Sequence, residues 1–386
     1  MQMKEVIDNL LKWAQGEKVA PEEVQIYPTN KCNLRCVFCY QQLQEYNLSD
    51  EVSHKRWLEI AKELCELGVK KILISGGGEP LAVPDTTIGI MKIFKSNNIH
   101  GRMIQNGTLW TDKTIQETIN MSWDDLTFSL DGPDAKTQDE LRGVKGCFDK
   151  IISNIKRFNH YKEKLGSEKP RIQITMVLCK TNYQKVTEMM ELAHQLNVNH
   201  VNIEPVCVNN PEVEKIKLGE KERIEFLDKS LPKAKEFAEK YNIYTNIDRI
   251  YGAKYIEKTG DLKEVILEKS KGAKESSKEK NKDKDIGHTK TKLKLPLMEL
   301  PCFEPWLWPK IEANGEVWPC STVPLKTNIK KISFKEVWFG PELTEFRANI
   351  VKKKLHDACS NCVLTHLDIN SEIKRELTKR LGSKQN

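Results

Sequence analysis

The sequence predicts an α/β protein whose main part is a partial (β/α)6 barrel, and three observations carry this prediction. Six short runs rich in β-branched and apolar residues recur along the first half of the chain. Segments with helical spacing separate these runs, and such alternation is typical of a parallel sheet. Polar and glycine-rich motifs follow four of the runs, at the carboxyl ends where parallel barrels collect their chemistry. Six units are fewer than the eight that close a barrel.

The strands are expected at six places, which are 24–27, 71–75, 102–105, 126–130, 171–178 and 200–205. The first intervening helix is expected after Ser49 and Asp50, because apolar residues from Trp57 to Leu67 repeat at helical spacing, and Gly68 should end it. Further helices are expected at 86–97, 147–164, 184–196 and 220–241.

The composition is that of a globular protein, with 386 residues, 39% hydrophobic residues and a net charge of +7. Much of that charge lies in one lysine-rich tract at 269–294, not on a basic face with interleaved aromatics, so nucleic acid is an unlikely partner. No apolar run is long enough to span a membrane, and residues 1–18 lack the apolar core of a signal peptide. We therefore expect a cytoplasmic protein without a membrane partner.

Three segments are expected from these patterns. Residues 1–250 should form the barrel, 251–299 a lysine-rich linker or insert, and 300–386 a small cysteine-rich domain. The lysine-rich tract is interpreted as a solvated segment, and docking to an acidic partner is the alternative.

Three cysteines lie in one short segment after the first strand, namely Cys32, Cys36 and Cys39. Three thiolates at this spacing can bind three irons of a cubane cluster and leave the fourth iron for another ligand. The alternative is a zinc site completed by a distant fourth ligand, although zinc sites are usually built from C-x2-C pairs.

This triplet, followed by the aromatic Tyr40, resembles the radical S-adenosylmethionine (radical SAM) superfamily. The resemblance implies a [4Fe–4S] cluster whose open iron binds the methionine end of S-adenosylmethionine (SAM), and reductive cleavage of SAM to a 5′-deoxyadenosyl radical. It also implies cofactor contacts for a set of residues near the strand ends. These are Tyr40 near adenine, Gly77, Gly78 and Glu79 at the methionine amino group, Asn106, Ser129 and Asp131 at the ribose or carboxylate, and Arg142 at the carboxylate.

A second set of four cysteines lies near the C-terminal end, and comprises Cys302, Cys320, Cys359 and Cys362. Asn314–Gly315 between the first two predicts a type I′ hairpin turn. The pattern resembles the twitch domain, a shortened SPASM domain, and implies one auxiliary [4Fe–4S] cluster with four thiolate ligands. Such a cluster should transfer electrons, because it has no open iron for substrate. Structural zinc is the alternative, with His356 or His366 as substitute ligands.

Two more cysteines, Cys179 and Cys207, follow the fifth and sixth strands, where a substrate would lie over the cofactor. Either thiol could return a hydrogen atom to a substrate radical, although structural packing is the alternative for both. The expected function is therefore hydrogen abstraction followed by oxidation, such as dehydrogenation or peptide or sugar modification, with epimerisation as the alternative. A non-enzymatic iron–sulfur sensor or a zinc-bearing nucleic-acid-binding protein would use the same cysteines without needing Glu79 or Arg142.

The expected partners are a small-molecule or peptide substrate and an electron donor such as flavodoxin or ferredoxin. Only about thirty residues precede the triplet, which disfavours a leader-peptide-dependent maturase.

Overall fold

The computed structural model describes residues 3–43, 46–208, 210–247, 295–362 and 364–382, and its centre is one curved sheet. The strand order is β7-β6-β5-β4-β3-β2-β1-β8-β9, and all neighbours are parallel except β8 and β9. The strands are β1 (Glu23–Ile26), β2 (Lys71–Ile74), β3 (His100–Gln105), β4 (Asp125–Ser129), β5 (Arg171–Leu178), β6 (His200–Pro205), β7 (Tyr244–Thr245), β8 (Lys310–Ile311) and β9 (Val317–Trp318). The six expected strands are thus confirmed as a parallel α/β sheet.

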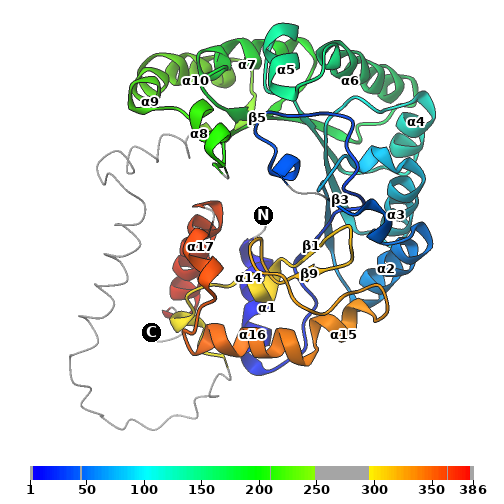
Figure 1. Cartoon of the computed structure of the whole chain (residues 1–386), viewed down its shortest axis with the longest axis vertical. Helices are drawn as coiled ribbons and strands as arrows, with labels where there is room; N and C mark the ends of the chain where they lie inside the picture. The colour runs from blue at the N-terminus through cyan, green and yellow to red at the C-terminus, as the bar shows by residue number, and fades with distance from the viewer. Residues whose placement is uncertain (1–2, 44–45, 209, 248–294, 363, 383–386) are drawn as a thin grey trace.

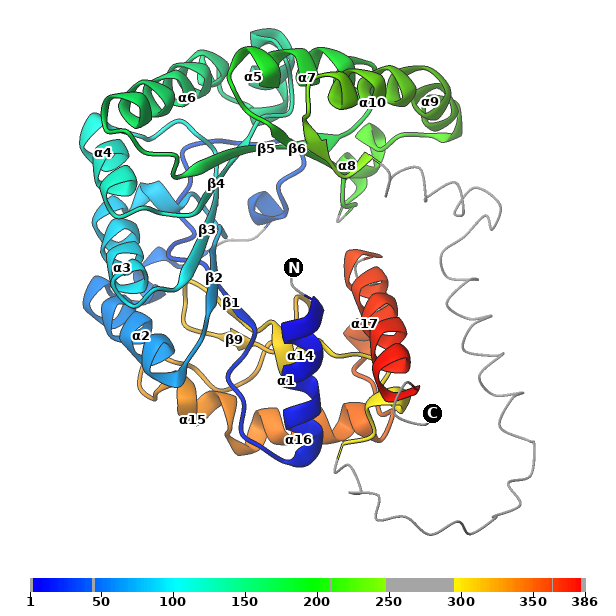
Figure 2. The same cartoon turned by 180° about the vertical axis from the view of Figure 1, so that it is seen from behind.

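Helices cover the convex side of this sheet, as Figures 1 and 2 show from opposite directions. Those that follow β1 to β6 are α2 (His54–Leu67), α3 (Pro84–Ser96), α4 (Asp112–Asn120), α5 (Ala135–Arg142), α6 (Cys147–Lys164), α7 (Val186–Gln195), α8 (Pro211–Ile216), α9 (Glu220–Glu225) and α10 (Leu231–Lys240). The remaining α-helices are α1 (Met3–Gln15), α14 (Glu304–Leu307), α15 (Phe334–Trp338), α16 (Pro341–Val351) and α17 (Leu364–Gly382). Short 3-10 or π turns occur at Tyr40–Leu43, Leu48–Asp50, Pro80–Ala82, Tyr183–Lys185, Phe226–Ser230, Leu297–Glu299 and Asp357–Asn361.

The start of α2 differs from the expectation. Ser53 caps this helix by accepting a hydrogen bond from the Arg56 N–H, whereas Ser49 and Asp50 lie in a separate 3-10 turn capped by Asn47. The expected end is confirmed, because Gly68 adopts a left-handed conformation with φ of +92°. Helices α4 and α5 were not expected, and the helix expected at 220–241 is interrupted by a π turn at Phe226–Ser230.

The C-terminal hairpin extends the barrel sheet. Strand β8 pairs in parallel with β1, with Gln25 opposite Lys310 and Ile26 opposite Ile311. The hairpin is where the sequence places it, but the predicted type I′ turn is wrong. Such a turn needs two residues with positive φ, and here Gly315 has positive φ whereas Asn314 does not. The Gly315 N–H donates to the Glu312 carbonyl and the Glu312 N–H to the Glu316 carbonyl, which is a type I turn with a glycine bulge.

A second hydrophobic core joins the two ends of the chain. Val6, Ile7 and Leu10 of α1 pack with Phe303, Trp306, Leu307, Ile373 and Leu377, all of them buried. The N-terminal helix therefore shares its core with the cysteine-rich segment, although the domain boundary at residue 250 stays a prediction. The lysine-rich tract at 269–294 lies outside the described residues. In the part of the chain that is described, no helix is both long and apolar enough to cross a membrane.

Candidate functional site

The cysteine triplet lies in a loop that follows β1 and is anchored to the end of α5. The Arg35 N–H donates to the Arg142 carbonyl and the Val37 N–H to the Leu141 carbonyl, both at 3.0 Å. Gly143 makes this contact possible, since it has φ of +67° and a Cβ there would lie 2.2 Å from the Arg35 carbonyl oxygen. The loop is thus held by backbone contacts, and in it Cys32 is exposed whereas Cys36 and Cys39 are partly buried.

Arg142 connects this loop to the barrel. Its guanidinium donates from Nη1 to Cys36 Sγ at 3.5 Å, pairs through Nη2 with Asp131 Oδ2 at 2.5 Å and lies over the Phe38 ring. Burial lowers the pKa of Arg142, but Asp131 and then Cys36 raise it more, so the net shift is upward. The side chain is therefore a permanent cation beside the triplet, and its Nε has no hydrogen-bond partner among the described residues.

Glu79 places a buried carboxylate beside the same loop. Its oxygens accept from the Leu81 N–H at 3.1 Å and the Asn106 N–H at 2.7 Å, and its electrostatic neighbours include Cys32 and Arg142. Burial raises the pKa of Glu79 to about 7. A cation bound next to this carboxylate would favour its ionised form, which fits an ammonium group.

The glycines before Glu79 allow close packing of two loops. A Cβ on Gly77 would lie 2.1 Å from Asn30 Oδ1, and one on Gly78 would lie 2.1 Å from the Lys31 carbonyl oxygen. The Gly78 N–H donates to the Thr29 carbonyl and the Glu79 N–H to the Lys31 carbonyl. These glycines bring the Glu79 loop against the segment that leads into the cysteine triplet.

Asn106 links the end of β3 to the cysteine loop, because its Nδ2 donates to Asn33 Oδ1 at 2.9 Å. Asp131 is fully buried after β4 and accepts from the Val177 N–H at 2.7 Å. Ser129 is half-buried at the end of β4. The structure thus brings these expected residues to the carboxyl edge of neighbouring strands.

Two buried amides that hold Asp131 were missed by the sequence analysis. Gln138 Oε1 accepts from the N–H groups of Asp131 and Gly132, and Asn182 Nδ2 donates to the Asp131 carbonyl. Gln138 precedes Arg142 by four residues, and this spacing on a helix could have indicated that both face the site. For Asn182 the sequence offers no such signal.

Tyr40 lies among other tyrosines at the boundary with the C-terminal hairpin. Its hydroxyl is a hydrogen-bond partner of Tyr27, and Tyr27, Tyr46 and Glu312 are its electrostatic neighbours. Burial raises the pKa of Tyr40 and raises that of Tyr27 to about 12, so both are neutral phenols near pH 7. Tyr40 therefore lies beside the hairpin, and its contact with adenine stays a prediction.

Lys310 joins the hairpin to β1 at this boundary. Its ammonium lies 4.0 Å from the Trp318 ring centroid and 5.2 Å from that of Tyr27, and it pairs with Glu312 at 2.6 Å. Because both charges are largely buried, the pair fixes the hairpin that leads to Cys320.

The four C-terminal cysteines gather around one place. Cys302 interacts electrostatically with Cys320 and Cys362, and Cys359 interacts with Cys320. Burial raises the pKa of Cys302, although the Glu304 N–H donates to its sulfur. Cys302 lies just before α14, Cys320 just after β9, and Cys359 and Cys362 in or just after the Asp357–Asn361 turn, so the fold assembles them from three separate parts of the segment.

Among the described residues, no group of three or more His, Cys, Asp or Glu side chains is close enough to hold one metal ion.

The two remaining candidate cysteines differ in accessibility. Cys179 has no exposed surface, and burial raises its pKa. Cys207 is exposed just after β6.

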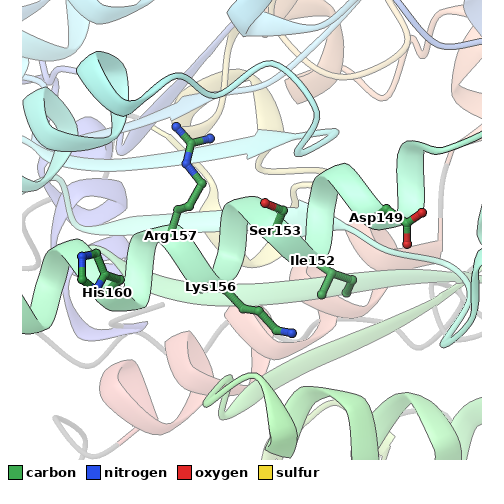
Figure 3. Close-up of a pocket in the computed structure, with 6 residues that line it drawn as sticks. All are labelled: Asp149, Ile152, Ser153, Lys156, Arg157 and His160. Carbon is green, nitrogen blue, oxygen red and sulfur yellow. The ribbon is translucent and has the colours of Figure 1, made fainter.

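A surface hollow of about 530 Å³ lies elsewhere, along the outer face of α6. Figure 3 shows that its six lining residues all come from this helix, namely Asp149, Ile152, Ser153, Lys156, Arg157 and His160. None is among the expected site residues, so this hollow is separate from the candidate site.

The structure is an open parallel barrel with a cysteine triplet at its carboxyl edge and a cysteine-rich segment added beyond it. This arrangement is the one expected of a radical SAM protein with an auxiliary iron–sulfur site. Residues 26–193 match the model of the radical SAM superfamily, and residues 302–363 match that of the SPASM iron–sulfur cluster-binding domain. The chain therefore carries a radical SAM domain and a C-terminal SPASM-type domain, which imply SAM, a [4Fe–4S] cluster and auxiliary iron–sulfur binding.

Relatives that are named for an enzymatic activity differ in how much of this chain they match. The AdoMet-dependent heme synthase of Methanosarcina barkeri is 26% identical over 89% of this chain and 88% of its own length. The probable GTP 3′,8-cyclase of Archaeoglobus fulgidus is 32% identical over 45% of this chain and 55% of its own. Other relatives are also matched over about half of their length or less, including the sporulation killing factor maturation protein SkfB of Bacillus subtilis at 37%.

Solved structures show the same fold at low identity. Streptococcus suis SuiB bound to precursor peptide SuiA has a TM-score of 0.59 and is 18% identical, over 89% of this chain and 71% of SuiB. Native anSMEcpe with bound AdoMet has a TM-score of 0.56 and is 17% identical, over 88% of this chain and 86% of its own.

Proposed function

We propose that this protein cleaves SAM reductively, abstracts a hydrogen atom from a substrate and passes the remaining electron to an auxiliary cluster, so that the net reaction is an oxidation. The observation that carries this proposal is the convergence of Glu79 and the Asp131–Arg142 pair on the cysteine triplet. An iron–sulfur sensor would need the thiolates but not these buried charges.

The residues around the triplet have separate tasks in this proposal. Cys32, Cys36 and Cys39 hold the cluster, and the Glu79 carboxylate receives the ammonium of SAM. Arg142 is charged at any accessible pH and balances the negative charge of Cys36 and of the SAM carboxylate. Asn106, Ser129, Asp131 and Tyr40 complete the cofactor site. When bound, the cluster and SAM supply a 5′-deoxyadenosyl radical that takes one hydrogen atom from the substrate.

The C-terminal cysteines support the oxidative outcome. Cys302, Cys320, Cys359 and Cys362 supply four thiolates, which fills the four irons of a cubane. In the balanced step the substrate radical loses one electron to this site and one proton to the medium. The substrate has then lost two hydrogens in total.

Epimerisation is the second candidate, and the exposure of Cys207 is the observation that favours it. In that reaction the Cys207 thiol gives one hydrogen atom to the substrate radical and becomes a thiyl radical that must later be reduced. The burial of Cys179 makes it the weaker donor.

The substrate class is proposed from the relatives. The heme synthase is matched over most of both chains, so an iron porphyrin is the first substrate to test. A peptide is the second, because SuiB and anSMEcpe share the fold and have been solved with peptides. A flavodoxin or ferredoxin is proposed as the electron donor, and the cytoplasm as the location.

The test is anaerobic reconstitution, followed by incubation with SAM, dithionite and each substrate. Oxidation should give 5′-deoxyadenosine and a product that is two mass units lighter than the substrate, because the substrate has lost two hydrogens. Epimerisation should give a product of unchanged mass that takes up one deuterium from heavy water, and this uptake should vanish in Cys207→Ala. A preparation that forms no 5′-deoxyadenosine would contradict both candidates and favour the sensor.

A further inference from the structure

Asn370 of α17 is the side chain that contacts the auxiliary site from outside the matched SPASM segment. The match ends at residue 363, and Asn370 lies on the helix that follows it. Its side chain is 6% exposed, so the amide is buried beside Cys302. Its Nδ2 lies 4.0 Å from Cys302 Sγ, within reach of a hydrogen bond to sulfur.

The orientation of this amide is determined by its other contact. Asn370 Oδ1 accepts from the Phe303 N–H at 2.7 Å. A backbone N–H can only donate, so the atom that faces it must be the amide oxygen, and the atom that faces the sulfur must be the NH2 group. Asn370 thus spans two consecutive residues and presents a donor to the Cys302 sulfur.

Lys374 adds positive charge to the same side of the site. It follows Asn370 by four residues, so both lie on one face of α17. Burial and Lys353 lower the pKa of Lys374, while its attraction to Cys302 raises it. Glu304 acts in the opposite sense, because its negative charge disfavours the Cys302 thiolate and raises the pKa of Cys302.

Packing keeps this helical face in place. Ile373 and Leu377 of α17 are fully buried against α1, and Arg380 pairs with Asp8 at 2.5 Å. The N-terminal helix therefore supports the element that carries Asn370.

We infer that Asn370, assisted by Lys374, is a positioning residue that raises the reduction potential of the auxiliary cluster. On reduction one electron enters the cluster, and its thiolate ligands become more negative. A hydrogen-bond donor and a cation stabilise that state more than the oxidised one, and hydrogen bonds to the sulfurs are a known determinant of cluster potential. The inference rests on the proposed electron-accepting role, since a higher potential makes the cluster a better acceptor.

The experiment measures the potential of the auxiliary cluster directly and needs no substrate. The background is the full chain with Cys32, Cys36 and Cys39 replaced by alanine, so that the remaining cluster gives the whole spectroscopic signal. After anaerobic reconstitution, the reduced fraction is followed by electron paramagnetic resonance against applied potential. Asn370→Leu should lower the equilibrium constant for reduction about tenfold, which is about 59 mV for a one-electron couple. Lys374→Met should lower it about threefold.

Matched controls separate this role from general packing. Asn159→Leu removes another partly buried amide, which donates to the Leu196 carbonyl on the far side of the barrel, and should leave the potential unchanged. Asn370→Asp keeps an acceptor for the Phe303 N–H but replaces the donor with negative charge, so it should lower the potential at least as much as Asn370→Leu.

An unchanged potential in Asn370→Leu with full iron content would overturn the inference. If the Asn370 variants lose their iron, Lys374→Met decides, and an unchanged potential there overturns it equally. Failure of SAM cleavage in the wild-type enzyme would instead contradict the proposed function and would leave these potentials as measured.

Discussion

Gly143→Ala should destabilise the cysteine loop by more than the conformational cost of placing an alanine at positive φ. Gly143 has φ of +67°, and an added Cβ would lie 2.2 Å from the Arg35 carbonyl oxygen. The left-handed conformation costs an alanine roughly 1 to 2 kcal/mol. Displacing the Arg35 carbonyl also strains the neighbouring Arg35–Arg142 backbone hydrogen bond, which contributes about 1 kcal/mol. The expected loss in unfolding free energy is therefore roughly 2 to 3 kcal/mol.

The chain offers a matched control for this prediction. Gly166 has φ of +60° and nothing within 4 Å of its would-be Cβ, so Gly166→Ala carries only the conformational cost. Urea unfolding of the apo chain should place Gly143→Ala about 1 kcal/mol below Gly166→Ala. After anaerobic reconstitution, only Gly143→Ala should lose iron, down to the content of the auxiliary site. Equal stability of the two variants with full iron in both would refute the contact between Gly143 and the cysteine loop.

Three further predictions concern buried charges. Lys310→Met should lower the unfolding free energy by roughly 3 kcal/mol, measured by urea unfolding, because it leaves Glu312 unpaired at a largely buried place; a loss below about 1 kcal/mol would contradict a buried pair. Glu79 has a pKa raised to about 7, so folding takes up a proton, and the stability of the apo chain should fall by roughly 3 kcal/mol as the pH rises from about 4.5 to 7. Glu79→Gln should abolish this slope, and an identical slope in the variant would assign it to another group. Arg142→Met should cost roughly 3 kcal/mol or more because Asp131 is fully buried, and Asp131→Asn in the same chain should recover part of that loss; additive losses in the double variant would argue against the pair.

The strands of the barrel could be predicted because their signal is local. Runs such as 171–178 and 200–205 alternate apolar, often β-branched residues with polar ones, and the structure has strands with those bounds. Helix α5 could not be found in the same way, since it has eight residues and only part of one side is buried. The start of α2 was misplaced because Ser49, Asp50 and Ser53 are all of residue types that cap helices, and the choice among them depends on packing that the sequence does not contain.

The candidate site shows the same division. The cysteine triplet was recognisable from its spacing, and Glu79 and Arg142 from the resemblance of their segments to the radical SAM family. The partners that orient them were not, because Asn182 and Gln138 act through contacts with Asp131 across separate loops. The pairing of β8 with β1 was likewise hidden, since a two-residue strand from a distant segment carries no pattern of its own.

The proposed function requires an iron of the N-terminal cluster that no cysteine occupies and that binds the methionine end of SAM. Electron–nuclear double resonance on the reduced enzyme with SAM labelled by 15N at its amino group measures this bond directly. We expect a 15N coupling in the wild-type enzyme and in Cys320→Ala, and no coupling when Cys32, Cys36 and Cys39 are replaced. A wild-type enzyme with full iron content and no coupling to labelled SAM would contradict the account.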